Sequence, residues 1–248
     1  MNPIKQLFGQ TAVYGMGIVL PRLLNYLLLT PFYTRIFAPD EYGIVTELYA
    51  YVVFLLVILT YGLETGFFRF STNNRNGDRK NVYTSIIVSV FSTSVLFLLI
   101  VYSFIHPVAG TLGYGNQPQY IKWLTLIVAI DAFTTIPFAR IRLMNRPLKY
   151  AIIRIIEVVV NIGLNLFFLF YCPRHTDSEF IMRVYNSDIG VGYVLISNLT
   201  ASIIKLVLLS SEILAATQGY LDKKLLKRIL VYAYPLLIAG LAGTINEA

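Results

Sequence analysis

The chain has 248 residues, of which 56% are hydrophobic and only 13% are charged, and its mean hydropathy is +0.66. A soluble domain carries roughly 25% charged residues, so this composition excludes an ordinary soluble enzyme and indicates a multi-pass membrane protein. The net charge of +7 does not indicate a nucleic-acid partner, because the basic residues are dispersed between apolar segments. The single cysteine, Cys172, excludes an intramolecular disulfide and a multi-cysteine metal site.

Long apolar segments follow one another along the chain. A bilayer core about 30 Å thick needs roughly 20 apolar residues per helix, and six segments reach that length. In chain order they are residues 11–33, 44–66, 82–105, 121–139, 150–171 and 189–213, and a seventh begins near residue 229. Backbone groups in hydrocarbon must pair internally, so each span is expected to be a helix. The first segment lacks the cleavage pattern of a secretory signal and is predicted to be retained as a span.

The basic residues between the spans alternate in number from one side to the other. The N-terminus and the loops after the second, fourth and sixth spans carry 14 lysines and arginines, whereas the opposite loops carry four. The positive-inside rule therefore predicts that the N-terminus and the basic loops are cytoplasmic.

The same segments suggest a division of the chain. Residues 1–218 are predicted to form a six-helix lobe, and residues 231–248 the start of a seventh helix and of a second lobe. Between them, residues 219–230 alternate leucines with cations, which suits an amphipathic helix on the cytoplasmic leaflet or an ordinary solvated end of the sixth span. Because the chain stops within a span, we expect it to be a fragment.

Five ionisable residues lie inside the apolar segments: Arg22, Glu64, Asp131, Glu157 and Lys205. A charge at the middle of a spanning helix costs about 2.5–3.5 kcal/mol on insertion scales, so such groups usually face a bundle interior, a partner or a water-filled path. The chain is therefore predicted to move something polar across a membrane.

The fifth span has the most regular polar pattern. Arg154, Glu157, Asn161 and Asn165 follow one another at i, i+3, i+7 and i+11, which places them on one helical face. This face is predicted to form the polar wall of a hydrated cavity. The alternative is hydrogen bonding between helices, with Arg154 and Glu157 paired at the interface.

The sixth span repeats the pattern with Asn198, Ser202 and Lys205 at i, i+4 and i+7. Lys205 lies near the predicted cytoplasmic end, so it either binds substrate or extends its ammonium to the membrane surface.

The first span carries Arg22 and Asn25 one turn apart. Arg22 lies near mid-depth, and its planar guanidinium suits phosphate oxygens. It is predicted to be a cavity cation; the alternative is a structural pair with Glu64, Asp131 or Glu157.

The second and fourth spans carry the remaining charges. Glu64 is close enough in sequence to Arg69 for a local ion pair, which would act as a structural latch or in gating and ion coupling. Asp131 is either a proton or sodium site or the partner of a cation. No catalytic motif is found in the sequence, so the protein is not expected to be an enzyme.

Five short motifs follow one another in the first seventy residues: Gly9-Gln-Thr-Ala-Val-Tyr-Gly15, Pro21-Arg-Leu-Leu-Asn25, Tyr33-Thr-Arg-Ile-Phe37, Glu41-Tyr-Gly43, and Tyr61-Gly-Leu-Glu64-Thr followed by Phe68-Arg69. In this order they resemble the polysaccharide-transport (O-antigen flippase) family of the multidrug/oligosaccharidyl-lipid/polysaccharide exporter superfamily. The resemblance implies 12–14 spans in two lobes around a central cavity. It also implies alternating-access export of undecaprenyl-pyrophosphate-linked sugars across the bacterial inner membrane.

On that hypothesis Arg22 and Lys205 bind the pyrophosphate, and Asn161 and Asn165 bind sugar hydroxyls, with Asn25 and Asn198 in the same cavity. Glu64, Asp131 or Glu157 couples Na⁺ or H⁺, with Arg69 assigned to the same gating group. The expected partners are a lipid-linked oligosaccharide, membrane lipids and a missing C-terminal lobe, and no cofactor or nucleic acid is expected. One alternative is a multidrug antiporter of the same superfamily, against which Arg22 counts. Another is a membrane enzyme of polysaccharide assembly, for which the loop 172–188 is too small.

Overall fold

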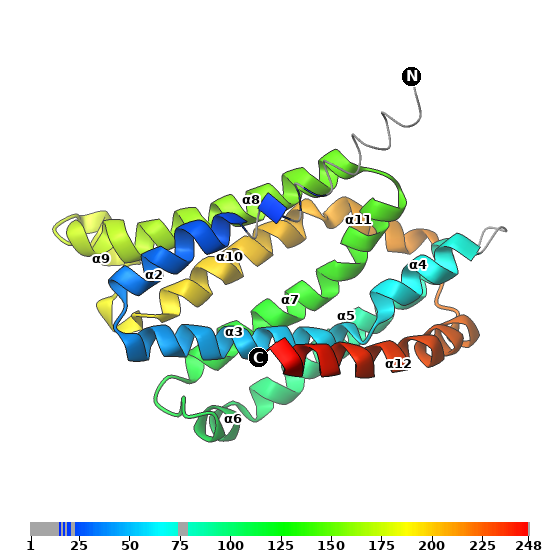
Figure 1. The fold of residues 1–248 in the computed structure, drawn as a ribbon, viewed down its shortest axis with the longest axis horizontal. Coiled ribbons are helices and arrows are strands. Elements are labelled where there is room, and N and C mark those ends of the chain that lie inside the picture. Colours follow the sequence, from blue (N-terminus) through cyan, green and yellow to red (C-terminus); the bar gives the residue numbers. More distant parts are fainter. Residues whose placement is uncertain (1–14, 16, 18, 21–22, 74–78, 248) are drawn as a thin grey trace. The chain divides into compact units, whose positions relative to one another are not determined.

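The computed structural model describes residues 15, 17, 19–20, 23–73 and 79–247, and these are helices joined by short connections (Figure 1). No strand occurs among them, which confirms the predicted all-α class. The elements are η1 (Asn25–Leu29), α2 (Thr30–Ile36), α3 (Pro39–Thr60), α4 (Leu63–Asn73), α5 (Arg79–Ser103), α6 (Ile105–Thr111), α7 (Pro118–Leu143), α8 (Pro147–Leu166), η2 (Phe167–Tyr171), η3 (Cys172–Arg174), α9 (Glu179–Val184), η4 (Ser187–Ile189), α10 (Gly192–Leu208), α11 (Ser210–Leu214), η5 (Ala215–Gln218) and α12 (Lys223–Glu247).

Five helical segments of the described chain are long and apolar enough to cross a membrane: Pro39–Thr72, Arg79–Ser103, Pro118–Leu143, Pro147–Arg174 and Lys223–Thr244. A sixth forms if Gly192–Leu208 and Ser210–Gln218, which bend by 50° at their junction, are one span. Each of these overlaps a span predicted from hydrophobicity. Eight residues of the predicted first span, 11–33, lie outside the described residues, and the described ones are helical, with η1 and α2 at the end of the span.

Proline marks the starts of three spans. Pro39, Pro118 and Pro147 begin α3, α7 and α8, where the missing N–H and the fixed φ of proline suit the first helical turn. At the other end of α7, Asn145 adopts a left-handed φ of 53°. The backbone N–H of Asn145 donates to Arg142 O and the backbone N–H of Arg146 donates to Ile141 O, so the helix ends in a Schellman motif.

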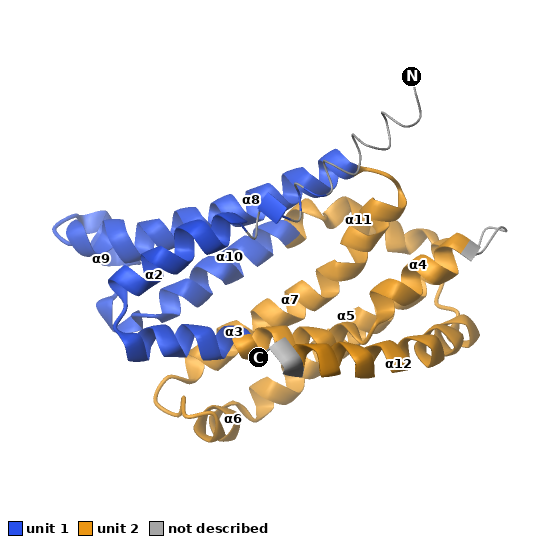
Figure 2. Cartoon of the chain, viewed as in Figure 1, with its two compact units in different colours: residues 1–49, 147–205 blue, residues 50–146, 206–248 orange. Residues whose placement is uncertain are grey.

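The chain divides into two compact units (Figure 2). Unit 1 comprises residues 1–49 and 147–205. Its hydrophobic core joins Leu29 and Tyr33 of η1 and α2 to Val158 and Ile162 of α8 and Val194 of α10. Since these residues come from distant parts of the sequence, packing of side chains rather than chain connection holds unit 1 together.

Unit 2 comprises residues 50–146 and 206–248. Its core joins Leu63 and Phe67 of α4 to Ile86 of α5, Ile136 of α7 and Ile229 of α12, all of them fully buried. In contrast, α5 turns large apolar side chains outward, among them Phe91, Leu96 and Leu99. A soluble protein rarely exposes such a surface, whereas lipid tails cover it without cost.

The junction of α3 and α4 depends on one glycine. Tyr61 and Gly62 both have positive φ, at 32° and 71°. A Cβ atom at Gly62 would lie 2.9 Å from the backbone oxygen of Ala233 and 3.0 Å from Leu236 Cβ, both in α12. Glycine is therefore required here both for its backbone conformation and for the close approach of α12.

α12 includes two of the predicted segments. It begins at Lys223, within the predicted linker 219–230, and continues through the apolar residues from 231 onward as one helix. The predicted division into a six-helix lobe, a cytoplasmic linker and the start of a second lobe stays a prediction.

Candidate functional site

Glu157 of α8 lies between two cations within unit 1. Arg154 Nη1 donates to Glu157 Oε2 at 3.0 Å, and Lys205 Nζ of α10 donates to Glu157 Oε1 at 2.6 Å. The side chains of Lys205, Glu157 and Arg154 are 2%, 16% and 34% exposed, respectively. Two cations share one carboxylate, so the group carries a net positive charge, and Arg154 is its accessible end.

The ammonium of Lys205 is buried, which differs from the exposed position predicted for a side chain that reaches the membrane surface, and its substrate role stays a prediction. The ammonium is buried and joins α10 to α8 through Glu157, and it also lies 3.5 Å from Ser202 Oγ. It therefore does not extend to the membrane surface in this structure.

The amides of α8 form a second part of the same polar face. Asn165 is fully buried, and its Nδ2 donates to Asn161 O at 2.8 Å and to Asn161 Oδ1 at 3.1 Å. Tyr33 Oη of α2 donates to Asn165 Oδ1 at 2.8 Å. The bond from Tyr33 joins α2 to α8, as the alternative of hydrogen bonding between helices predicted, whereas the bonds to Asn161 lie within α8. A role for Asn161 and Asn165 toward sugars stays a prediction.

Two further predicted residues belong to unit 1. Asn198 Nδ2 of α10 donates to Tyr49 Oη of α3 at 2.8 Å, which adds another bond between helices. Asn25 begins η1, and its buried Oδ1 has no hydrogen-bond partner among the described residues. Arg22, the predicted cavity cation, lies outside the described residues.

In unit 2 Glu64 forms its ion pair with Arg142 of α7. The suggested local partner Arg69 instead places its guanidinium over the ring of Tyr232, 4.5 Å from the centroid. The reason is helical geometry, because residues five apart lie on different faces of a helix, whereas residues three or four apart are neighbours. The ion pair of Glu64 thus joins α4 to α7 and does not form within α4.

Asp131 lies in the middle of α7. The hydroxyls of Thr134 and Thr135 donate to its backbone oxygen, at 3.1 and 3.0 Å. These threonines are therefore occupied by the helix backbone. The ion-coupling role of Asp131 stays a prediction.

One charged cluster of unit 2 was not among the predicted site residues. Glu212 of α11 has a carboxylate that is 2% exposed, and it pairs with Arg140 of α7. Arg146 Nη1 lies 3.7 Å from the other carboxylate oxygen. Tyr83 Oη of α5 donates to the backbone oxygen of Glu212 at 2.7 Å. Sequence reasoning counted the arginines only as orientation signals, although Glu212 is the sole acid of the predicted span 189–213.

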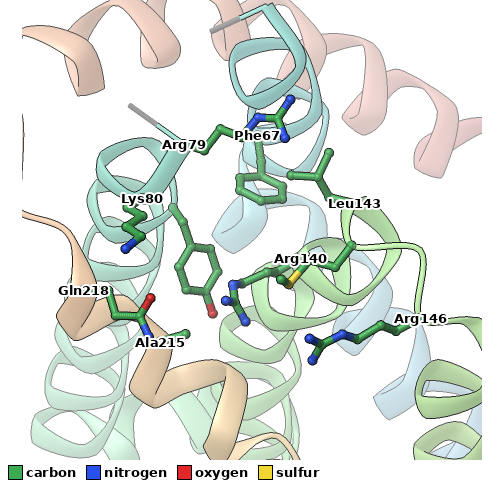
Figure 3. Close-up of a pocket in the computed structure, with 10 residues that line it drawn as sticks. Phe67, Arg79, Lys80, Arg140, Leu143, Arg146, Ala215 and Gln218 are labelled. Atoms are coloured by element: carbon green, nitrogen blue, oxygen red, sulfur yellow. The ribbon is translucent and has the colours of Figure 1, made fainter. Parts of the chain in front are cut away.

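This cluster borders a pocket of about 420 Å³. Figure 3 shows Arg140 and Arg146 on one side of the pocket and Lys80 and Gln218 on the other. Groups of three or more metal-ligating side chains are not found in the described part of the chain. The side chains that line the pocket include cations and the amide of Gln218, and these groups suit an anion.

Membrane-length helices, lipid-compatible outer faces and charged networks inside the spans define a multi-pass membrane protein. The model of the family described as polysaccharide biosynthesis protein matches residues 7–248, and the chain belongs to this family. No curated protein and no solved structure matches the chain at a significant level.

Proposed function

We propose that this chain supplies one lobe of a transporter that moves lipid-linked oligosaccharides across the bacterial inner membrane by alternating access. The carrier lipid would be undecaprenyl pyrophosphate, and the N-terminus would be cytoplasmic. Membership of the polysaccharide biosynthesis family supports the connection to saccharides. Na⁺ or H⁺ would drive the cycle, and no enzymatic step on the saccharide is proposed.

The network of Arg154, Glu157 and Lys205 carries this proposal. Apolar side chains in place of a buried ion pair are often neutral or stabilising, so three charges inside spanning helices are not explained by stability. Ionisable residues in such positions usually mark the path of a polar substrate or ion. Arg154 is the cation best placed to bind an anionic substrate, because it is the most exposed member of the network.

The proposal is tested by transport in vesicles. The full-length protein is reconstituted with a fluorescent lipid-linked oligosaccharide, and the fraction of label reaching the opposite leaflet is followed over time. Arg154→Gln removes the accessible cation while Lys205 still neutralises Glu157, so the helices should remain packed. We expect the transport rate to fall about tenfold, because the variant loses one charge-assisted hydrogen bond at a partly exposed site.

Arg174→Gln is the matched control, since Arg174 is exposed at the end of the same span, where its Nη1 donates to Phe170 O at 2.8 Å and its guanidinium lies over the Phe170 ring. It should transport at the wild-type rate. Unchanged transport in Arg154→Gln would contradict the assigned role of the network. Efflux of a lipophilic cation without movement of the saccharide would contradict the proposed substrate and favour the multidrug antiporter.

A further inference from the structure

The pocket of unit 2 is lined by cations from two segments that are distant in the sequence. Arg79 and Lys80 begin α5, Arg140 lies in the last turn of α7, and Arg146 follows that helix. Gln218, at the end of η5, adds a side-chain amide. The volume of about 420 Å³ lies within the range of roughly 300–1,000 Å³ typical of small-ligand sites.

The carboxylate of Glu212 is shared by two of these cations. Arg140 is 19% exposed and Arg146 is 53% exposed, and both contact this one acid. Arg79 Nε donates to the backbone oxygen of Ser71 at 2.9 Å. Within the described part of the chain, neither Arg79 nor Lys80 is paired with a carboxylate. The pocket therefore has an excess of positive charge.

Several contacts fix the walls of the pocket. The guanidinium of Arg140 lies 5.2 Å from the ring centroid of Tyr83, whose hydroxyl is bonded to Glu212 O. On the opposite side, Thr84 Oγ1 donates to Ala216 O at 2.7 Å, which attaches η5 to α5.

The segment after η5 is equally close to α5. A Cβ atom at Gly219 would lie 2.6 Å from the backbone oxygen of Lys80, so this position admits only glycine without rearrangement. The segments that carry the cations are thus held against one another before any ligand arrives, which lowers the entropy that binding would cost.

We propose that this pocket binds the phosphate group of a membrane lipid. Planar guanidinium groups match phosphate oxygens in bidentate hydrogen bonds, and a lysine adds a point charge. The segments that form the pocket are those that the positive-inside rule assigns to the cytoplasmic face, where lipid head groups lie. The phosphate would come from an anionic phospholipid or from a polyprenyl diphosphate. The site is distinct from the network of unit 1. An anionic phospholipid would be a ligand beyond the transport proposed above, whereas binding of a polyprenyl diphosphate rests on that proposed function.

The test measures binding to the full-length protein in zwitterionic nanodiscs by calorimetry. Three probes are titrated: inorganic pyrophosphate, short-chain phosphatidylglycerol and farnesyl diphosphate. The double variant Lys80→Gln/Arg146→Gln removes two exposed cations and spares the buried pair of Arg140 and Glu212. We expect Kd to rise about tenfold or more for each probe that binds the pocket.

The control is Lys224→Gln/Lys227→Gln, which removes the same charge from α12 outside this pocket. It should change Kd less than about twofold. If the pocket variant weakens binding of phosphatidylglycerol alone, the ligand is a resident phospholipid. If it weakens binding of farnesyl diphosphate alone, the ligand is a polyprenyl carrier. An effect on pyrophosphate as well would show that the phosphate itself is recognised.

The proposal fails if no probe binds the wild-type protein, or if the control weakens binding as much as the pocket variant. Both double variants change exposed residues, so a normal size-exclusion profile is expected and checked before titration. Transport by Arg154→Gln is a separate measurement. A failure of the lipid site can therefore be distinguished from a failure of the transport proposal.

Discussion

The pair of Glu157 and Lys205 gives the sharpest prediction. Glu157→Gln leaves the Lys205 ammonium, 2% exposed, without its carboxylate at 2.6 Å. Breaking a buried ion pair from one side costs about 3–5 kcal/mol, and we expect the lower end because Glu157 is partly exposed. Lys205→Met should cost less, about 1–2 kcal/mol, because Arg154 still neutralises Glu157.

The double variant Glu157→Gln/Lys205→Met removes both charges and should be within about 1 kcal/mol of the wild type. The cycle therefore predicts a coupling free energy of about 3–5 kcal/mol between the two positions. The assay is reversible unfolding of the full-length protein in mixed micelles, followed by circular dichroism during titration with SDS. A single variant as stable as the wild type, or a coupling near zero, would refute the reasoning.

The same double variant separates stability from transport. If the network acts only between helices, the restored stability should be accompanied by normal movement of the lipid-linked oligosaccharide. If the charges bind substrate or a coupling ion, transport should remain low although the protein is folded. Normal transport by the stable double variant would remove Glu157 and Lys205 from the proposed mechanism.

Three further predictions concern stability, measured as unfolding of the full-length protein in micelles. Gly62→Ala should cost about 2–4 kcal/mol of stability, because Gly62 has a positive φ and lies against α12. The control Gly163→Ala, with open space around it, should change stability by less than about 1 kcal/mol, and equal effects of the two variants would contradict this account. Tyr33→Phe should cost about 1–3 kcal/mol, since it leaves the buried Asn165 Oδ1 without its donor, and a silent Tyr33→Phe would show that the bond contributes nothing. Asn145→Gly should be tolerated and Asn145→Val should cost about 1–2 kcal/mol more, so similar stabilities would exclude a requirement for the left-handed residue.

Much of the fold could be predicted because its determinants are local. The lengths of the apolar segments place the spans, and prolines such as Pro118 and Pro147 mark where helices begin. The break at Gly62 was not predicted, since its cause is the approach of Ala233, a residue far along the chain.

The candidate site was only partly predictable for a similar reason. The spacing of Arg154, Glu157, Asn161 and Asn165 predicts one polar face, and the structure has all four on α8, but the role of this face as the wall of a cavity stays a prediction. The spacing could not show that Tyr33 occupies the Asn165 amide, because that hydrogen bond joins residues 132 positions apart.

The sequence by itself determined which segments are helices and membrane spans, because hydrocarbon requires every backbone group to be paired within its own segment. Only the tertiary structure decided the partner of each charge. Lys205 pairs with Glu157 across 48 positions, and Arg140 with Glu212 across 72. Such pairs depend on the rotation and packing of whole helices, which arise from many side-chain contacts at once and leave no local pattern in the sequence.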